Sequence, residues 1–360
     1  VDAALARGER LGVSIVEPKQ VSLFSAGLHC AVGTSEGTAL FEDESGREAV
    51  ARIVRGGRFA ALDVKQTVHC VYPADTAETA LVDDADLMGM DAFDLSLAAY
   101  VLDSSVAEYT FDALLGVYCD GVLPESKGDA DMAAIQAAAA RMLAQPLAEA
   151  LDADGTKDAY FDIDLPLIGV LAIMERTGAS IDCDHLARLG ASTQVELDDL
   201  SGRIYDLAGE EFNIDSPKQL SRVLFEELGL KPLKKNQRGY STDAAVLKEL
   251  AKEHELPSLV LRYRELAKIK STYIDALPRM RGADGRVHTC FNETVTTTGR
   301  LSSSDPNLQN IPVRTDFGRQ IRACFVPLAP GQKFLSADYS QIELRLLAHL
   351  SGDEHLVAAF

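Results

Sequence analysis

Two stretches in the second half of the sequence combine residue types that could contact a nucleic acid and a metal ion. Residues 298–314 gather amides and guanidinium groups among few apolar residues: Arg300, Asn307, Gln309, Asn310 and Arg314. Such groups hydrogen-bond base edges in a minor groove as well as phosphates, as a protein that grips duplex without reading its sequence requires. Farther on, Asp338 follows a predicted short strand at 334–337. A carboxylate there, beside a carbonyl group, suits Mg2+, although a helix-capping aspartate is the commoner interpretation of one such residue.

Basic residues precede these stretches on elements that the sequence predicts to be helical. Ser216, Pro217 and Gln219 give a helix start, and Gly229 gives its stop. The loop 231–242 that follows carries Lys234 and Lys235 and ends in Ser241 and Thr242, hydroxyl residues that could cap the next helix. A cationic loop between two helices could hold a phosphate backbone, and an ordinary solvated loop is the alternative.

A second basic segment lies at residues 262–273. The spacing of Arg264, Lys268 and Ser271 places these three side chains on one face of a helix, next to Lys270 and Thr272. As a run of charge alone, this segment carries little information.

The net charge of −20 argues against a nucleic-acid partner only if the charge is evenly spread, and it is not. Residues 1–162 hold 11 basic and 28 acidic residues, whereas residues 231–345 hold 19 basic and 12 acidic residues. An acidic first half followed by a basic region fits a single polyanion-binding region. A solvated charge asymmetry remains an equal alternative.

The first half of the sequence predicts an α/β domain. Short β-type runs occur at 13–16, 21–24, 39–41 and 67–72, and apolar residues at helical spacing occur at 95–102 and 132–143. Residues 150–158 are acidic and rich in small residues, so we expect a linker there and a domain boundary near 150–162. After it, a stripe from Leu197 to Leu207 predicts a helix that Gly209 ends.

The composition places this chain among ordinary globular proteins, since 47% of the 360 residues are hydrophobic and 25% are charged. The six cysteines are far apart and show no zinc-ligand spacing, so we expect free thiols. Without an apolar run of membrane-spanning length or a signal-peptide pattern, a cytoplasmic protein without membrane contact is expected.

Three strings of the second half together resemble the family A DNA polymerases, of which bacterial DNA polymerase I is the type. They are Thr298–Ser303, Asp305–Pro312 and Asp338–Arg345, and the likeness continues back through Lys268–Tyr273 and 233–235 to Leu165. It covers about 200 residues with the motifs in family order. The resemblance implies an α/β exonuclease-like (ribonuclease H-like) domain at 1–155, a mainly helical thumb and base at 163–285, and the beginning of an α+β palm at 286–360.

The resemblance also implies partners and residue roles. Asp338 and the Tyr339 carbonyl match the ligands of the two catalytic Mg2+ ions, and Glu343 matches the residue that excludes a ribose 2′-hydroxyl. The residues implied to contact the deoxynucleoside triphosphate are Glu343, Arg314, Ser340 and Gln341. Those implied to contact primer-template DNA are Arg300, Asn307, Gln309, Asn310, Lys234, Lys235, Ser241, Thr242, Lys268, Lys270, Ser271 and Thr272. A monomer acting in DNA replication and repair is expected.

The first half is similar to the family's 3′→5′ exonuclease domain, most clearly around residues 93–103, but departs from its catalytic pattern. The expected Asp-x-Glu pair is missing from the strands at 11–16 and 21–24. Glu125 stands where a Tyr is expected, four residues before Asp129. We therefore expect a relic without proofreading activity, in which Asp129 and Asp131 are solvated helix residues.

These 360 residues do not contain the family's fingers helix or its second palm carboxylate. We therefore expect a fragment of a longer enzyme, inactive alone, with a non-catalytic duplex-binding module as the alternative. A single-subunit RNA polymerase is disfavoured because Glu343 is present, and a nuclease because the exonuclease carboxylates are missing.

Overall fold

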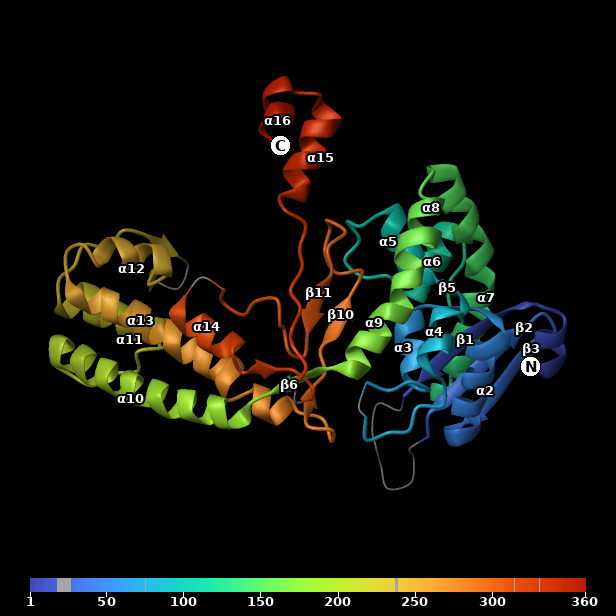
Figure 1. The fold of residues 1–360 in the computed structure, drawn as a ribbon, viewed down its shortest axis with the longest axis horizontal. Helices are drawn as coiled ribbons and strands as arrows, with labels where there is room; N and C mark the ends of the chain where they lie inside the picture. The colour runs from blue at the N-terminus through green and yellow to red at the C-terminus, as the bar shows by residue number, and fades with distance from the viewer. Residues whose placement is uncertain (18–26, 75, 237–238, 314, 330) are drawn as a thin grey trace. The chain divides into compact units, whose positions relative to one another are not determined.

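The computed structural model describes residues 1–17, 27–74, 76–236, 239–313, 315–329 and 331–360 (Figure 1). The chain divides into two compact units, Val1–Phe325 and Val326–Phe360. The predicted strand at 21–24 lies outside the described residues.

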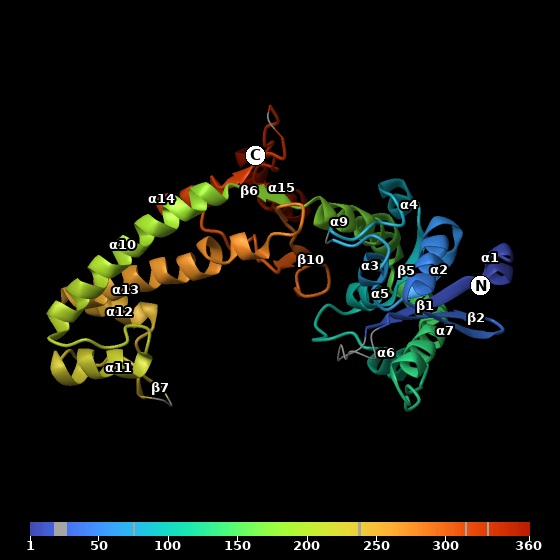
Figure 2. The same ribbon diagram turned by 90° about the horizontal axis from the view of Figure 1, so that it is seen from below.

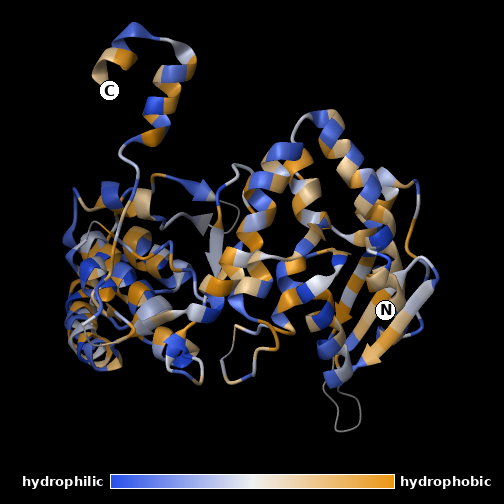
Figure 3. Ribbon diagram, turned by 45° about the vertical axis from the view of Figure 1, so that its right-hand side comes forward, coloured by the Kyte–Doolittle hydropathy of each residue, from blue (hydrophilic) through white to orange (hydrophobic). Residues whose placement is uncertain are grey.

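The first unit begins with a five-stranded sheet in the order β3-β2-β1-β4-β5. β1 pairs antiparallel with β2 and parallel with β4. The β2–β3 pair is also antiparallel, and the β4–β5 pair is also parallel. The strands, which carry mostly hydrophobic residues (Figure 3), are β1 (Arg10–Val16), β2 (His29–Thr34), β3 (Gly37–Glu42), β4 (Arg58–Ala61) and β5 (Asp91–Asp94).

The helices α2 (Asp43–Gly56), α3 (Val64–His69), α5 (Leu95–Leu102) and α7 (Asp129–Asp154) pack against this sheet. The shorter helices α1 (Asp2–Ala6), α4 (Asp84–Met88) and α6 (Phe111–Tyr118) add residues to the same core. α7 lies so close to β1 and β2 that a Cβ at Gly12 would stand 1.8 Å from the carbonyl oxygen of Ala137. Glycine is required at position 12 because any side chain would displace the helix.

The middle of the chain is helical, as the sequence predicts. A short helix, α8 (Lys157–Ala159), and a π-helical turn, η1 (Tyr160–Asp164), lead into α9 (Leu165–Thr177). Two long helices, α10 (Cys183–Ala208) and α13 (Glu255–Ile269), then run side by side (Figure 2) over a shared core that includes Leu197, Ile204 and Leu266. Between them in sequence are α11 (Pro217–Arg222), η2 (Val223–Glu227), β7 (Lys235–Asn236), β8 (Gly239–Tyr240) and α12 (Ala244–Leu250).

The remainder of the first unit is a set of short strands and turns. They are β6 (Ala179–Ile181), η3 (Lys270–Ile274), η4 (Leu277–Met280), β9 (Arg286–Val287), β10 (Cys290–Asn292), β11 (Ser302–Ser304), α14 (Asp316–Arg322) and β12 (Phe325–Val326). β10 and β11 form an antiparallel hairpin, and β12, β6 and β9 form a separate small sheet.

The second unit contains α15 (Ile342–Ser351) and α16 (Glu354–Ala359). Hydrophilic and hydrophobic residues alternate along α15 (Figure 3). Arg345 stabilises the unit because its Nη1 donates to the Phe360 carbonyl oxygen at 3.2 Å.

Several predicted boundaries are confirmed. Gly209 ends α10 in a left-handed conformation, with φ at 76°. Ser216 caps α11 by accepting a hydrogen bond from the Gln219 N–H, with Pro217 at the first helical position. The strands predicted at 13–16 and 39–41, and the helices predicted at 95–102 and 132–143, are present. All six cysteines are free.

Three predictions are wrong in their secondary structure. Residues 67–69 end helix α3 and 70–72 form a turn, because Asp63 caps that helix through the Gln66 N–H and outweighs the β-branched residues. Residues 150–154 continue α7 instead of forming a linker, and the left-handed Gly155 ends it. Residues 334–337 are not a strand, because a strand needs a pairing partner and the described residues of the second unit provide none.

Candidate nucleic-acid interface

The β10–β11 hairpin presents the loop that contains Arg300. Phe291 pairs with Ser303, so the loop spans residues 293–301. Thr296 Oγ1 donates to the Arg300 carbonyl oxygen at 2.6 Å, which closes the loop on itself. Gly299 has φ of 75°, a conformation that favours glycine. The Arg300 residue is exposed at the end of this closed loop.

A turn that follows β11 holds the predicted amide residues. Asn307 Oδ1 accepts the backbone N–H groups of Gln309 and Asn310, each at 3.1 Å. Gln309 Nε2 donates to the Leu301 carbonyl oxygen at 3.1 Å. All three amide residues are exposed, and two of them also fix the backbone that carries them. Arg314 lies outside the described residues.

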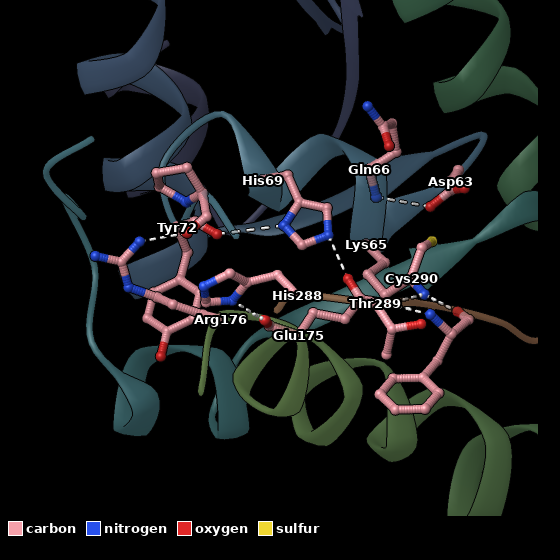
Figure 4. A network of polar contacts seen from close by, with 12 residues as sticks. Asp63, Lys65, Gln66, His69, Tyr72, Glu175, Arg176, His288, Thr289 and Cys290 are labelled. Atoms are coloured by element: carbon pink, nitrogen blue, oxygen red, sulfur yellow. Dashed lines mark hydrogen bonds and ion pairs between the residues drawn. The ribbon is translucent and has the colours of Figure 1, made fainter. Parts of the chain in front are cut away.

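The base of the hairpin rests on a buried carboxylate, Glu175, which is 1% exposed (Figure 4). Its Oε1 accepts the Phe291 N–H at 2.7 Å and pairs with Lys65 Nζ at 2.8 Å. Its Oε2 lies 2.7 Å from His69 Nε2. Three segments, α3, α9 and β10, therefore meet at one carboxylate.

The electrostatics of this network favour its charged form. Burial alone would raise the pKa of Glu175, but hydrogen bonds from His69, Lys65 and the Phe291 N–H together lower it. Burial would lower the pKa of Lys65, and the bond to Glu175 raises it instead.

A small cavity of about 170 Å³ lies beside the network and is lined by Lys65, Asp94 and Glu293, among others. Burial, followed by the charge of Asp94, raises the pKa of Glu293 to about 8. The Oε1 atom of Glu293 is buried without a hydrogen-bond partner among the described residues, so this carboxyl stays largely protonated at neutral pH.

Sequence reasoning missed Glu175 and Lys65. A signal was present, because Glu175 occupies the position seven residues after Ile168 on the face that Leu171 and Ala172 also share. A carboxylate at a core position of an apolar helix requires a buried partner. Its partner lies 110 residues away in the sequence, which no local pattern indicates.

The predicted cationic loop forms a small β7–β8 hairpin. Lys234 is exposed and its Nζ lies 3.3 Å from Asp243 Oδ2, while Lys235 Nζ stands 5.7 Å over the ring of Tyr240. Ser241 and Thr242 are both buried, at 6% exposure. The cap of α12 is Asp243, which accepts the Val246 N–H, so the expectation that the hydroxyl residues would cap this helix is wrong.

The second basic segment is divided between solvent and internal contacts. Lys268, Ser271 and Thr272 are exposed. Lys270 is half-buried and paired with Asp275 at 2.8 Å. Arg264 donates to the carbonyl oxygens of Thr242 and Ile214, which ties α13 to the loops around it.

In the second unit, the candidate metal and nucleotide residues lie at the start of α15. Asp338, Tyr339, Ser340 and Gln341 precede the helix and Glu343 is in its first turn, all of them exposed. Arg345 Nε donates to the Ser340 carbonyl oxygen at 3.0 Å and holds this approach to the helix. The described residues contain no group of three or more His, Cys, Asp or Glu side chains arranged to hold a metal ion.

Comparisons with known proteins agree with this architecture. A family model described as DNA polymerase family A matches residues 183–360. The chain is 44% identical over 284 residues to DNA polymerase I of Geobacillus stearothermophilus, and this alignment covers 74% of this chain and 32% of the relative. It is 52% identical over 209 residues to DNA polymerase I of Chloroflexus aurantiacus, and this alignment covers 56% of this chain and 22% of the relative.

A solved structure is similar over almost the whole chain. The polymerase domain of Pol1 from M. smegmatis, in complex with DNA primer-template and dNTP, has a TM-score of 0.79 and 32% identity over 99% of this chain and 62% of that one. The fold is therefore that of a DNA polymerase I polymerase domain. The chain belongs to DNA polymerase family A. It spans about a third of the length of curated relatives that it matches.

Among the described residues, none of the helices combines the length and the apolar character needed to cross a membrane.

The buried network predicts a large effect of one substitution. Lys65→Met leaves the Glu175 carboxylate buried with one donor fewer, and we expect the free energy of unfolding to fall by about 3 kcal/mol, as for other broken buried pairs. The matched control is Lys157→Met, which breaks an ion pair with Asp152 whose side chains are 54% and 68% exposed and should change stability by less than about 1 kcal/mol. Urea denaturation measures both, and equal effects would contradict the importance of the network.

Proposed function

We propose that this chain contains part of the polymerase region of a DNA-templated DNA polymerase that acts as a cytoplasmic monomer in replication and repair. The observation that carries the proposal is the ordered run of motifs from Arg300 to Glu343 inside the segment that matches the family. The similar M. smegmatis domain, which was solved with primer-template DNA and dNTP, supports DNA and nucleotide as partners.

The proposed division of labour follows the elements. Residues 163–285 form the thumb and its helical base, with Lys234, Lys235, Lys268 and the exposed hydroxyl residues facing the phosphate backbone. Residues 286–360 form the beginning of the palm, where Arg300, Asn307 and Gln309 contact the duplex. Glu343 excludes a ribose 2′-hydroxyl, and Arg314, Ser340 and Gln341 contact the incoming nucleotide.

The donor set at Asp338 fits a hard cation. Its carboxylate is exposed and has no hydrogen bond or ion pair to another described residue, and the next residue in the sequence, Tyr339, offers a carbonyl oxygen. Asp338 and Tyr339 would hold Mg2+, which would activate the primer 3′-hydroxyl and stabilise charge on the triphosphate. Two metal ions require a second carboxylate, and the family's second palm carboxylate is not among these 360 residues. We therefore propose that the 360 residues alone do not catalyse extension.

Residues 1–155 are proposed to be an exonuclease-like domain of ribonuclease H type without catalytic activity. The mixed sheet with β1 at its centre supports the architecture. At the centre of this sheet, Ser14 donates to Gln136 Oε1 at 2.8 Å, and β1 carries no carboxylate. Asp129 and Asp131 lie in the first turn of α7, where Asp131 accepts the Lys127 N–H.

Duplex binding should depend on salt and not on sequence. Reversing Lys234 and Lys235 together to Glu should weaken binding equally for unrelated duplexes and reduce the slope of log affinity against log salt by about 2, because each phosphate contact releases counterions. The control reverses Lys248 and Lys252, two lysines of the same helical region, and should have a smaller effect. Fluorescence anisotropy over a salt series measures both, and an affinity that depends on duplex sequence but not on salt would refute this interface.

Primer extension tests the catalytic role of Asp338. We expect no extension by the 360-residue chain, and extension by a chimera in which the fingers and remaining palm of the Geobacillus relative follow Phe360. Asp338→Ala should abolish the activity of the chimera, and Glu343→Ala should raise its use of ribonucleotides. Extension at full rate by the Asp338→Ala chimera would be incompatible with the proposal, as would extension by the 360 residues alone.

The exonuclease proposal has a separate assay. Purified chain incubated with Mg2+ and a labelled single strand should release no nucleotides from the 3′ end. Release that persists in Asp338→Ala but stops in Asp129→Ala would show an active exonuclease and overturn the proposed relic.

A further inference from the structure

Two side chains, one in the last turn of α5 and one just after the helix, hold the loop that leads to Arg300. The Tyr100 hydroxyl donates to the Thr296 carbonyl oxygen at 2.7 Å and accepts the Gly299 N–H at 3.0 Å. Ser104 Oγ donates to the Thr297 carbonyl oxygen at 3.1 Å. Three backbone groups of the loop, at residues 296, 297 and 299, are therefore bonded to a segment almost 200 residues away.

Tyr100 is itself firmly placed. Helix α5 begins at Asp94, a buried N-cap whose carboxylate accepts the Leu97 and Val64 N–H groups and the Ser96 hydroxyl. The Tyr160 hydroxyl bonds both the N–H and the carbonyl oxygen of Asp94. The Tyr100 residue is 7% exposed, and its ring meets that of Tyr109 edge-on at 6.2 Å. The hydroxyl is thus presented from a rigid element.

The bonds reach Arg300 through the loop backbone. The Thr296 carbonyl oxygen accepts a hydrogen bond from the Tyr100 hydroxyl, and the Thr296 hydroxyl donates to the Arg300 carbonyl oxygen. Gly299, the residue before Arg300, is held by its N–H. With both ends of this short segment fixed, the backbone of Arg300 has little freedom left to lose when a ligand binds.

We propose that Tyr100 is a positioning residue for Arg300, by which the catalytically silent first domain raises the affinity of the palm for duplex DNA. The inference rests on the proposed function, in which Arg300 contacts the duplex. The hydroxyl fixes the loop before DNA arrives, so the ordering cost is met during folding and not during binding. The phenyl ring of Phe at position 100 would fill the same space and leave the Thr296 and Gly299 backbone groups without their partner.

The test compares Tyr100→Phe with Tyr109→Phe in the 360-residue chain. Each variant removes one hydroxyl from the same ring pair, but Tyr109 donates to the Asp103 carbonyl oxygen and not to the loop. We expect Tyr100→Phe to weaken binding of a fluorescent primer-template duplex about fivefold, as expected for the loss of ordinary hydrogen bonds, and Tyr109→Phe to change it less than twofold. Thermal denaturation of both variants checks that folding is retained. Ser104→Ala, at a partly exposed position that carries one of the three loop bonds, should weaken binding in the same direction and serves if Tyr100→Phe does not fold.

Combination with Arg300→Ala separates positioning from general destabilisation. If Tyr100 acts through Arg300, the double variant Tyr100→Phe, Arg300→Ala should bind no more weakly than Arg300→Ala alone. An equal loss in both backgrounds would overturn the proposal, and so would wild-type affinity in Tyr100→Phe when Arg300→Ala is weakened. No effect of Arg300→Ala also overturns it, whereas failure of the wild-type chain to bind any duplex refutes the proposed function itself.

Discussion

The buried carboxylate of Glu175 is the constraint on which the first unit depends. A charged group with 1% exposure is tolerated only when its hydrogen-bonding capacity is satisfied, and here the donors come from three separate segments. Lys65 and His69 belong to the helix after β4, and the Phe291 N–H belongs to the hairpin that carries the Arg300 loop. Removing any donor leaves charge in a low-dielectric surrounding. The N-terminal sheet, the helix α9 and the hairpin therefore pack together cooperatively, because all three depend on this one carboxylate.

A second set of polar contacts joins elements that neighbour the Glu175 network in the sequence. Asp94 caps α5, and Tyr160 bonds both backbone groups of Asp94, so the strand β5 and the π-helical turn before α9 are joined. Burial raises the pKa of Asp94 to about 7, the charge of Asp63 adds to the rise, and the bonds from Leu97, Val64 and Ser96 oppose it. The polar contacts of the N-terminal sheet and its helices determine where the hairpin and its loop lie.

Local sequence predicted the parts of this fold that depend on local energies. The Ser216-Pro217 start and the Gly209 stop were readable because caps and left-handed glycines act within one helical turn. The errors at 67–72 and 150–154 have the same origin: a capping Asp63 and the Ala-rich helix α7 outweighed β-branched and small-residue signals. Family resemblance, and not periodicity, gave Asp338 and Arg300 their proposed roles. The Glu175 network and the Tyr100 contacts could not be predicted from local sequence patterns, because the residues that they join are about 110 and 200 positions apart.

The close approach of α7 to the sheet depends on small residues in both elements. Gly12 and Gly33 are paired on neighbouring strands, and both face the Ala137 carbonyl, which lies 1.8 and 2.8 Å from where their Cβ atoms would be. Ala31, Ala133 and Ala137 fill the remaining contact. Small residues at these positions bring α7 against β1 and β2. The same helix packs against α5, which carries Tyr100, so the close contact with the sheet also fixes the element that holds the Arg300 loop.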